Sequence, residues 1–218
     1  MLSYEFHSQK PTEITTFEEH FHTKPVIMKK QLLTIAALCF LLIAASAAAQ
    51  TRTAGNEGPK PPQNKVFIAY VFSRFESIPD PSCLTHINYA FGHVNDTFNG
   101  VRIDNPDKLK KIAKLKRKYP HLKVLLSIGG WGSGRFSEMS ADPELRLAFA
   151  EDCRKVVRRY RLDGIDIDWE YPGVGTAGIS FSENDTENYT LLMRDIRAAI
   201  GPDKILSQAT VASARFID

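Results

Sequence analysis

The sequence predicts an α/β fold, a (β/α)8 barrel that is truncated after about five strands. Two observations carry this prediction. Short apolar runs typical of buried strands alternate with helical patterns over most of the chain, which is the order that parallel βαβ units produce. No hairpin signal interrupts that order, so right-handed crossovers are expected. A complete barrel takes about 250 residues, whereas this chain has 218 and its last predicted strand lies near the C-terminus.

The composition is that of an ordinary globular protein. Its hydrophobic content of 43% is sufficient for a core, and its length fits one domain or part of one. The 28 basic residues nearly balance the 25 acidic ones, so the net charge of +3 does not indicate a polyanionic partner. The cysteines form no disulfide framework, and Cys83 and Cys153 are expected to be unpaired, buried thiols.

Residues 28–49 have the parts of a secretory signal peptide. Lysines follow Met28, an apolar run comes next, and small residues end at Ala49, after which cleavage is expected. The protein is then secreted or periplasmic. The alternative is that the segment is retained as a membrane anchor, because the apolar run approaches the length needed to span a membrane. In that case alone is contact with a membrane expected. We interpret the polar residues 1–27 as a mis-assigned start, with a cytoplasmic extension ahead of an anchor as the alternative.

The folded region is expected to span residues 65–218, after an extended linker at 50–64 that contains several glycines and prolines. Its first two strands are predicted at 65–72 and 86–94. The first is a nearly continuous apolar run, which is typical of a strand buried on both faces.

A helix is predicted to begin at Pro106, with Asn105 as its cap, and to end before Pro120. Its lysines could indicate nucleic acid. A basic helix face is most often simply solvated, however, and no aromatic residues are interleaved here, so no nucleic-acid partner is expected. A strand is predicted next at 122–128, followed by a helix at 143–160 that Asp142 caps. The acidic strand and a glycine-rich loop at 173–178 come after it. The last two elements are a helix, which is capped by Asn184 or Asp185 and ends at Gly201, and a strand at 205–211.

The acidic strand, within residues 163–172, carries the most informative pattern. Apolar and acidic side chains alternate, so three carboxylates project from one face. The apolar members are Ile165, Ile167 and Trp169, and the acidic members are Asp166, Asp168 and Glu170. Shielded acids repel one another and lose hydration, and the usual reason to tolerate this is catalysis by carboxyl groups with different pKa values. A solvated outer strand face and a Ca²⁺ or Mg²⁺ site are the alternatives.

The preceding strand ends in a second notable segment, from Ser127 to Gly132. Gly129 and Gly130 allow a tight turn or a close approach of the backbone to a ligand. Trp131, next to them, offers a flat apolar face that can stack on a sugar ring. By itself the segment could equally be a turn with a packed aromatic residue.

Together these segments resemble the family 18 glycoside hydrolases, the chitinase-like enzymes. The acidic strand matches the family signature Asp-x-x-Asp-x-Asp-x-Glu, and the match continues through Trp169, Tyr171 and Pro172. Ser127 to Gly130 is similar to the family's Ser-x-Gly-Gly motif on the strand before. The signature is supplied here by Asp163, Asp166, Asp168 and Glu170. The resemblance covers Lys65 to the C-terminus, which corresponds to the N-terminal half, or slightly more, of the family's catalytic domain.

The resemblance implies hydrolysis of β-1,4 bonds in chitin or N-acetylglucosamine oligosaccharides, by a substrate-assisted, retaining mechanism that needs no metal or organic cofactor. Glu170 would be the general acid and then the general base. Asp168 would orient the substrate's acetamido group, and Asp166 would share a proton with Asp168. The expected roles of the other residues are substrate contact for Trp131, Tyr171, Tyr70 and Gly130, and structural support for Asp163 and Gly129.

The same resemblance leaves three functional questions open. Relatives draw further substrate contacts from later strands, so this chain alone is expected to be inactive. An endo-β-N-acetylglucosaminidase acting on glycoproteins would share the same motif. A non-catalytic, lectin-like chitin-binding protein could use the same barrel, although the presence of Glu170 favours an enzyme.

Overall fold

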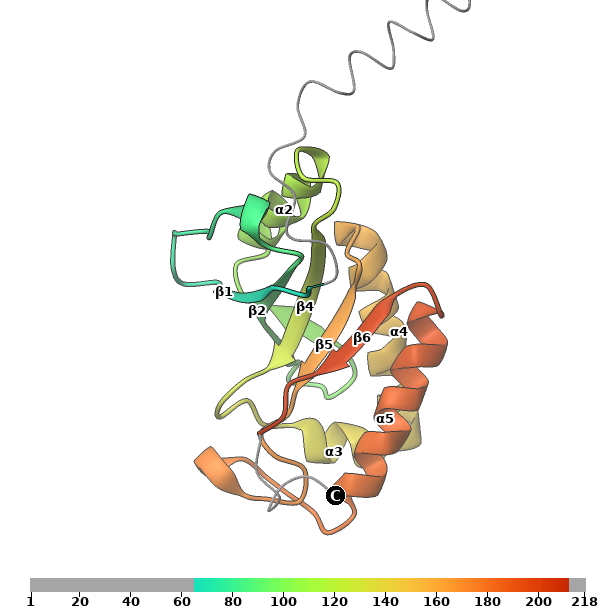
Figure 1. Ribbon diagram of the computed structural model, residues 1–218. Helices are drawn as coiled ribbons and strands as arrows, with labels where there is room; N and C mark the ends of the chain where they lie inside the picture. The colour runs from blue at the N-terminus through green and yellow to red at the C-terminus, as the bar shows by residue number, and fades with distance from the viewer. Residues whose placement is uncertain (1–64, 212–218) are drawn as a thin grey trace, which may run out of the picture. The chain divides into compact units, whose positions relative to one another are not determined.

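The computed structural model describes residues 65–211, so the predicted extension (1–27), signal peptide (28–49) and linker (50–64) lie outside the described residues. The described part is built on one sheet whose parallel strands follow the order β1-β2-β4-β5-β6 (Figure 1). These strands are β1 (Ile68–Phe72), β2 (His86–Val94), β4 (Lys123–Gly129), β5 (Gly164–Asp168) and β6 (Ile205–Gln208). The sheet does not close on itself, and its parallel βαβ order is the one predicted.

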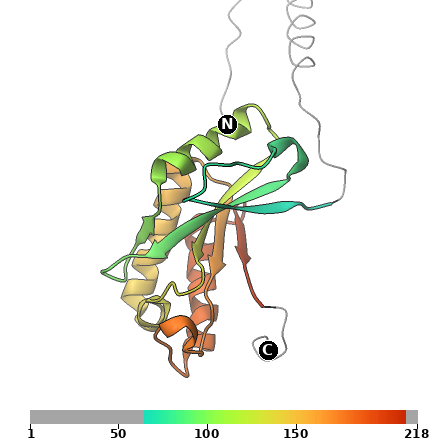
Figure 2. The ribbon, with the colours of Figure 1, turned by 90° about the vertical axis from the view of Figure 1, so that its left-hand side faces the viewer.

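Helices cover one face of this sheet (Figure 2). They are α2 (Pro106–Lys114), α3 (Phe136–Ala141), α4 (Pro143–Tyr160) and α5 (Asp185–Ile200), with short 3₁₀ turns at Pro81–Cys83, Leu115–Arg117 and Thr176–Gly178. The core lies between the helices and the sheet, where Phe149, Leu192 and Ile196 pack with strand residues such as Ile165 and Ile167. None of the helices between residues 65 and 211 has the length and apolar character needed to cross a membrane.

Local sequence signals set several boundaries as predicted. Strand β2 and helix α4 begin and end at the predicted residues. The Asp142 carboxylate accepts the backbone N–H groups of Glu144 and Leu145 at 2.8 and 3.2 Å, which satisfies two free donors of the first turn of α4. Asn105 caps α2 in the same way, through the N–H of Lys108 at 3.2 Å.

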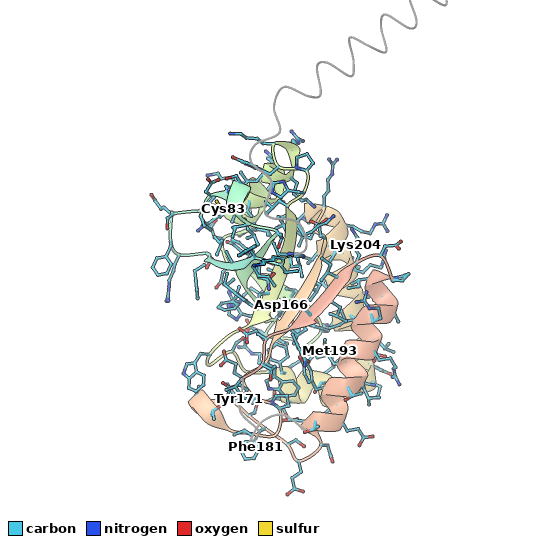
Figure 3. The ribbon with its side chains drawn as sticks, viewed as in Figure 1. Cys83, Asp166, Tyr171, Phe181, Met193 and Lys204 are labelled. Atoms are coloured by element: carbon cyan, nitrogen blue, oxygen red, sulfur yellow. The ribbon has the colours of Figure 1, made fainter. Side chains whose placement is uncertain are left out.

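Three expectations are corrected by the structure. The chain contains a hairpin, because β3 (Val101–Ile103) pairs antiparallel with β2, and its short, polar-flanked run carried little strand signal. Strand β1 is not buried on both faces, since Ile68 is 52% exposed and, among the described strands, β1 lies at the sheet edge beside β2. Of the two cysteines between residues 65 and 211, Cys153 is buried and Cys83, labelled in Figure 3, is exposed; both are unpaired.

A buried ion pair joins α4 to α5. Arg146 Nε donates to Asp195 Oδ2 at 2.7 Å, and the two side chains are only 7% and 8% exposed. Arg146 also donates to the carbonyl of Ser140 at 2.7 Å, so it fixes the turn between α3 and α4 as well. Arginine side chains are rarely buried, and the apolar residues next to Arg146 in the sequence did not indicate that its side chain would be.

We expect Asp195→Ala to lower the free energy of unfolding by about 3 to 5 kcal/mol, because the substitution leaves the Arg146 charge buried without its partner. Urea unfolding followed by circular dichroism measures the loss. Glu151→Ala is the matched control, since it breaks a pair with Arg154 within α4 whose side chains are 35% and 42% exposed, and it should change stability little. Equal effects of the two substitutions would contradict the structural role of the buried pair.

Candidate active site

The centre of the candidate site is a row of polar residues across three neighbouring strands. Ser127 of β4, Asp166 of β5 and Ser207 of β6 are register partners, so their side chains share one face of the sheet. This is the face opposite the helices, since the alternate residues Ile165 and Ile167 belong to the core between sheet and helices. Asp166 lies among the strands near the middle of the sheet (Figure 3).

Hydroxyl groups surround the Asp166 carboxylate. Its Oδ2 accepts hydrogen bonds from Tyr70 at 2.8 Å and Ser127 at 2.9 Å, and its Oδ1 accepts one from Ser207 at 2.6 Å. Only 1% of Asp166 is exposed. A buried polar group needs hydrogen-bond partners in place of water, and the three hydroxyl groups supply them to Asp166.

Asp168, the last residue of β5, is 9% exposed and lies between two other acids of the motif in sequence. Burial raises the pKa of its carboxyl to about 7, and the negative charges of Glu170 and Asp166 add to that effect. The two neighbouring aspartates are therefore in different environments. Asp166 accepts hydrogen bonds from three hydroxyl groups, whereas a carboxyl pKa of about 7 leaves Asp168 protonated in about half of the molecules at neutral pH.

The raised pKa makes a prediction about stability. Between about pH 4 and pH 7 the folded chain keeps a proton on Asp168 that the unfolded chain has lost. The contribution of Asp168 to stability is therefore fully present below about pH 4 and is lost as the pH rises through about 7. We expect Asp168→Asn to weaken this decline in unfolding free energy, as measured by urea unfolding at several pH values. An unchanged decline would contradict the buried, protonated Asp168.

Glu170 and Tyr171 lie beyond the carboxyl end of β5, where Figure 3 shows Tyr171. Glu170 is half-buried, and its carbonyl accepts the Thr176 hydroxyl at 3.1 Å. Burial raises the pKa of Tyr171, and a hydrogen bond with Glu170 together with the charges of Glu170 and Asp168 raises it further. The structure thus brings the predicted acid and one of the predicted aromatic residues into direct contact.

Hydrogen bonds to Asp185, which is fully buried, hold the loop that follows Glu170. The Asp185 Oδ1 accepts the Ser137 hydroxyl at 2.7 Å, and its Oδ2 accepts the N–H groups of Gly173 at 3.2 Å and Ser182 at 2.9 Å. Asp185 was expected only as a possible helix cap. It instead links α3, the loop and the start of α5, and it thereby limits the movement of the segment that carries Glu170.

Glycine is required where β4 meets β5. A Cβ on Gly129 would lie 1.9 Å from the Asp168 carbonyl oxygen, and Gly129 and Gly130 both have positive φ angles of 128° and 93°. Gly130 N–H donates to the same carbonyl at 2.8 Å. Trp131 follows and is 67% exposed at this end of the sheet, so its ring is available for contact, as predicted for a sugar-binding residue.

Two predicted residues have mainly structural contacts. The Asp163 Oδ2 accepts the Val124 N–H at 2.8 Å and the Lys116 ammonium at 2.7 Å, at the opposite, amino end of β5. These contacts join Asp163 to β4 and to Lys116, and its expected supporting role stays a prediction. Tyr70 was expected to line the substrate cleft; its hydroxyl is used on Asp166, although 41% of the residue is exposed.

Ser207 is the contact that sequence reasoning missed. It was assigned to a predicted strand, and its place next to the apolar Leu206 was the available signal: Leu206 packs against the core, so Ser207 faces the other side of the sheet. In the part of the chain that the structure describes, no group of three histidine, cysteine, aspartate or glutamate side chains is arranged to hold a metal ion.

Comparison with known proteins agrees with this geometry. The chain is 32% identical to "Probable chitinase 2" of Drosophila melanogaster over 204 residues, which are 83% of this chain and 41% of that protein. A solved family 18 N-acetylglucosaminidase from Paenibacillus barengoltzii aligns with a TM-score of 0.65 at 39% identity, covering 70% of this chain and 48% of that one. The chain therefore spans less than half the length of these relatives.

A third relative was solved with a ligand. It is the Group IV chitinase of Ostrinia furnacalis in complex with allosamidin, which aligns with a TM-score of 0.64 at 27% identity over 71% of this chain and 46% of that one. The parallel sheet described above matches the corresponding part of these folds, so the predicted truncated (β/α)8 barrel is confirmed. The profile described as "Glycosyl hydrolases family 18" matches residues 61–218, and the chain belongs to that family.

Proposed function

We propose that this chain carries the acid-bearing part of a chitinase-type glycoside hydrolase that cleaves β-1,4 bonds between N-acetylglucosamine units. The observation that carries the proposal is the carboxyl cluster on β5. Asp166 accepts hydrogen bonds from neighbouring hydroxyl groups, and the pKa of Asp168 is raised to about 7. Glu170 follows at the carboxyl end of the strand. Family membership and the chitinases among the relatives support the substrate class.

In this mechanism Glu170 protonates the glycosidic oxygen that leaves and later removes a proton from the attacking water. The nucleophile is the acetamido carbonyl oxygen of the substrate itself, which closes a ring on the anomeric carbon and retains its configuration after hydrolysis. Glu170 suits this role by position, because it lies past the last residue of β5, at the carboxyl end of the strands where barrel enzymes bind substrate.

Asp168 acts on the acetamido group. When the proton that Asp168 shares with Asp166 passes to Asp166, the ionised Asp168 carboxylate accepts the acetamido N–H, which orients the carbonyl oxygen for attack, and its negative charge stabilises the cation that forms. Asp166 takes that proton, while Tyr70, Ser127 and Ser207 hold its carboxyl group in place. Trp131 and Tyr171 offer aromatic surface for the sugar rings. Gly130 supports the turn before Trp131, since a Cβ at this position would lie 2.8 Å from the Phe91 ring.

The experiment that tests the function is hydrolysis of a fluorogenic chitobioside. We expect residues 50–218 alone to be inactive, because the described sheet is open. We expect activity from a completed barrel, in which this chain is fused to the remaining strands of the Paenibacillus relative, of which it covers 48%. Near-ultraviolet circular dichroism confirms that each form is folded. A folded, completed barrel that binds chito-oligosaccharide without hydrolysing it would instead support a lectin-like protein.

We also propose that the protein is exported, with translation starting at Met28 and cleavage following Ala49. The basic, apolar and small-residue parts of residues 28–49 support this proposal. Mass spectrometry of the protein recovered from the culture medium or periplasm should give an N-terminus at Gln50. Recovery of the uncut chain in membranes would indicate an anchor instead.

A further inference from the structure

A second cluster of reactive side chains lies outside the carboxyl cluster. Ser133, His93 and Asp104 form a continuous hydrogen-bonded chain. His93 Nδ1 lies 2.8 Å from Ser133 Oγ, and His93 Nε2 lies 3.1 Å from Asp104 Oδ2. We propose that these three residues form a second site that hydrolyses short-chain carboxylic esters, such as acetyl esters, with Ser133 as nucleophile.

The hydrogen bonds define the role of each group. Asp104 accepts a proton-bearing Nε2, so Nδ1 keeps its lone pair and accepts the Ser133 hydroxyl. Burial alone would raise the pKa of Asp104, but hydrogen bonds from His93 and Arg102 hold it below its ordinary value, so the carboxylate stays charged. A nucleophile bound to a base, with the base oriented by an acid, is the arrangement that activates serine in hydrolases. The two ring nitrogens are exchanged relative to the familiar triad, and either nitrogen can transfer the proton.

The fold keeps the three residues in position. His93 lies near the end of β2 and is the register partner of Arg102 in β3, which delivers Asp104 one residue after the strand ends. The Asp104 N–H donates to the Phe91 carbonyl at 3.0 Å, and the Ser133 N–H donates to the Gly130 carbonyl at 2.9 Å. The hairpin that the sequence did not reveal therefore supplies two of the three groups.

A cavity of about 250 Å³ adjoins the cluster. It is lined by His93 and Ser133 together with Arg102, Trp131 and Arg135. This volume is below the range of about 300 to 1,000 Å³ usual for drug-sized ligands, so it suits a short acyl group. Both arginines that line the cavity are paired, Arg102 with Asp104 at 2.6 Å and Arg135 with Asp96 at 2.7 Å, so they fix its walls. The side chains of His93 and Asp104 are 20% and 35% exposed, which leaves access for an ester and for water.

The reaction balances without a cofactor. Ser133 Oγ attacks the ester carbonyl while its proton passes to His93 Nδ1, and the oxyanion collapses with cleavage of the bond to the alkoxy group, which leaves with that proton as an alcohol. Water then attacks the acyl-serine as His93 Nδ1 takes its proton. The acyl–Oγ bond breaks, Ser133 regains a proton from His93, and the carboxylic acid is released.

The test uses p-nitrophenyl acetate, which contains no glycosidic bond, with the chain itself. We expect Ser133→Ala and His93→Gln each to lower the hydrolysis rate by about 100-fold or more, and Ser180→Ala, at an exposed serine outside the cluster, to leave it unchanged. A wild-type rate in folded Ser133→Ala would overturn the proposal.

A fluorophosphonate probe gives an independent readout on the unsubstituted chain. Peptide mass spectrometry should locate the adduct on Ser133 and not on Ser180, and the adduct should be lost in His93→Gln. Absence of labelling at Ser133, or equal labelling of the two serines, would overturn the proposal even if the variants failed to fold.

Discussion

Glu170→Gln should abolish hydrolysis of a chito-oligosaccharide by the completed barrel, with a loss of about 10²- to 10⁴-fold in kcat. Glutamine preserves the size of the side chain but cannot donate the proton that the leaving oxygen needs. Substrate binding should remain, because the aromatic and glycine residues around the cleft are unchanged. Initial rates with a fluorogenic chitobioside, and isothermal titration with chitohexaose, measure the two effects separately.

Glu183→Gln is the matched control for that substitution. Glu183 is exposed in the same region of the chain, between the loop after β5 and helix α5, so removal of its charge should leave turnover unchanged. Equal rates for the Glu170 variant and the unsubstituted barrel would remove Glu170 from the mechanism. Loss of binding together with turnover would show instead that Glu170 holds the substrate or its loop.

The fold was predictable because its signals are local. The alternation that defines β5 and the caps at Asn105 and Asp142 act over a few residues, and the structure uses each of them. Strand β3 and helix α3 escaped prediction because both are short and owe their stability to tertiary contacts. For β3 one such contact is the Val101 N–H donating to the Asp152 carboxylate at 2.8 Å.

The site was predictable only in part, for the same reason. The carboxyl residues stand in one contiguous motif, so the sequence brings them together directly. Tyr70 and Ser207 reach Asp166 across 96 and 41 positions of the chain, and only the register of the sheet brings them there. Asp104 likewise reaches His93 through the hairpin of β2 and β3, and Ser133 reaches it from the loop after β4. Long-range contacts of polar residues leave no periodic trace in a sequence.

Asp168→Asn should lower kcat of the completed barrel by about 10²- to 10³-fold, while KM changes little. Asparagine keeps the shape of aspartate and one oxygen acceptor, but it cannot carry the negative charge that opposes the developing cation. An interaction made only in the transition state affects kcat and kcat/KM equally when it is removed. Initial rates over a range of chitobioside concentrations separate the two parameters, with the exposed Asp203→Asn as control.

Two measurements on Asp168 therefore test one physical idea. In the resting protein its ionised form is disfavoured by burial and by the charges of Glu170 and Asp166, which is why its pKa is raised to about 7. The same shielding from water strengthens its attraction to a cation formed beside it. Asp168→Asn should thus remove a pH-dependent destabilisation of the fold and, in the completed barrel, the stabilisation of the transition state. A variant that changes stability without changing turnover would show that Asp168 is buried for structural reasons and would remove it from the mechanism.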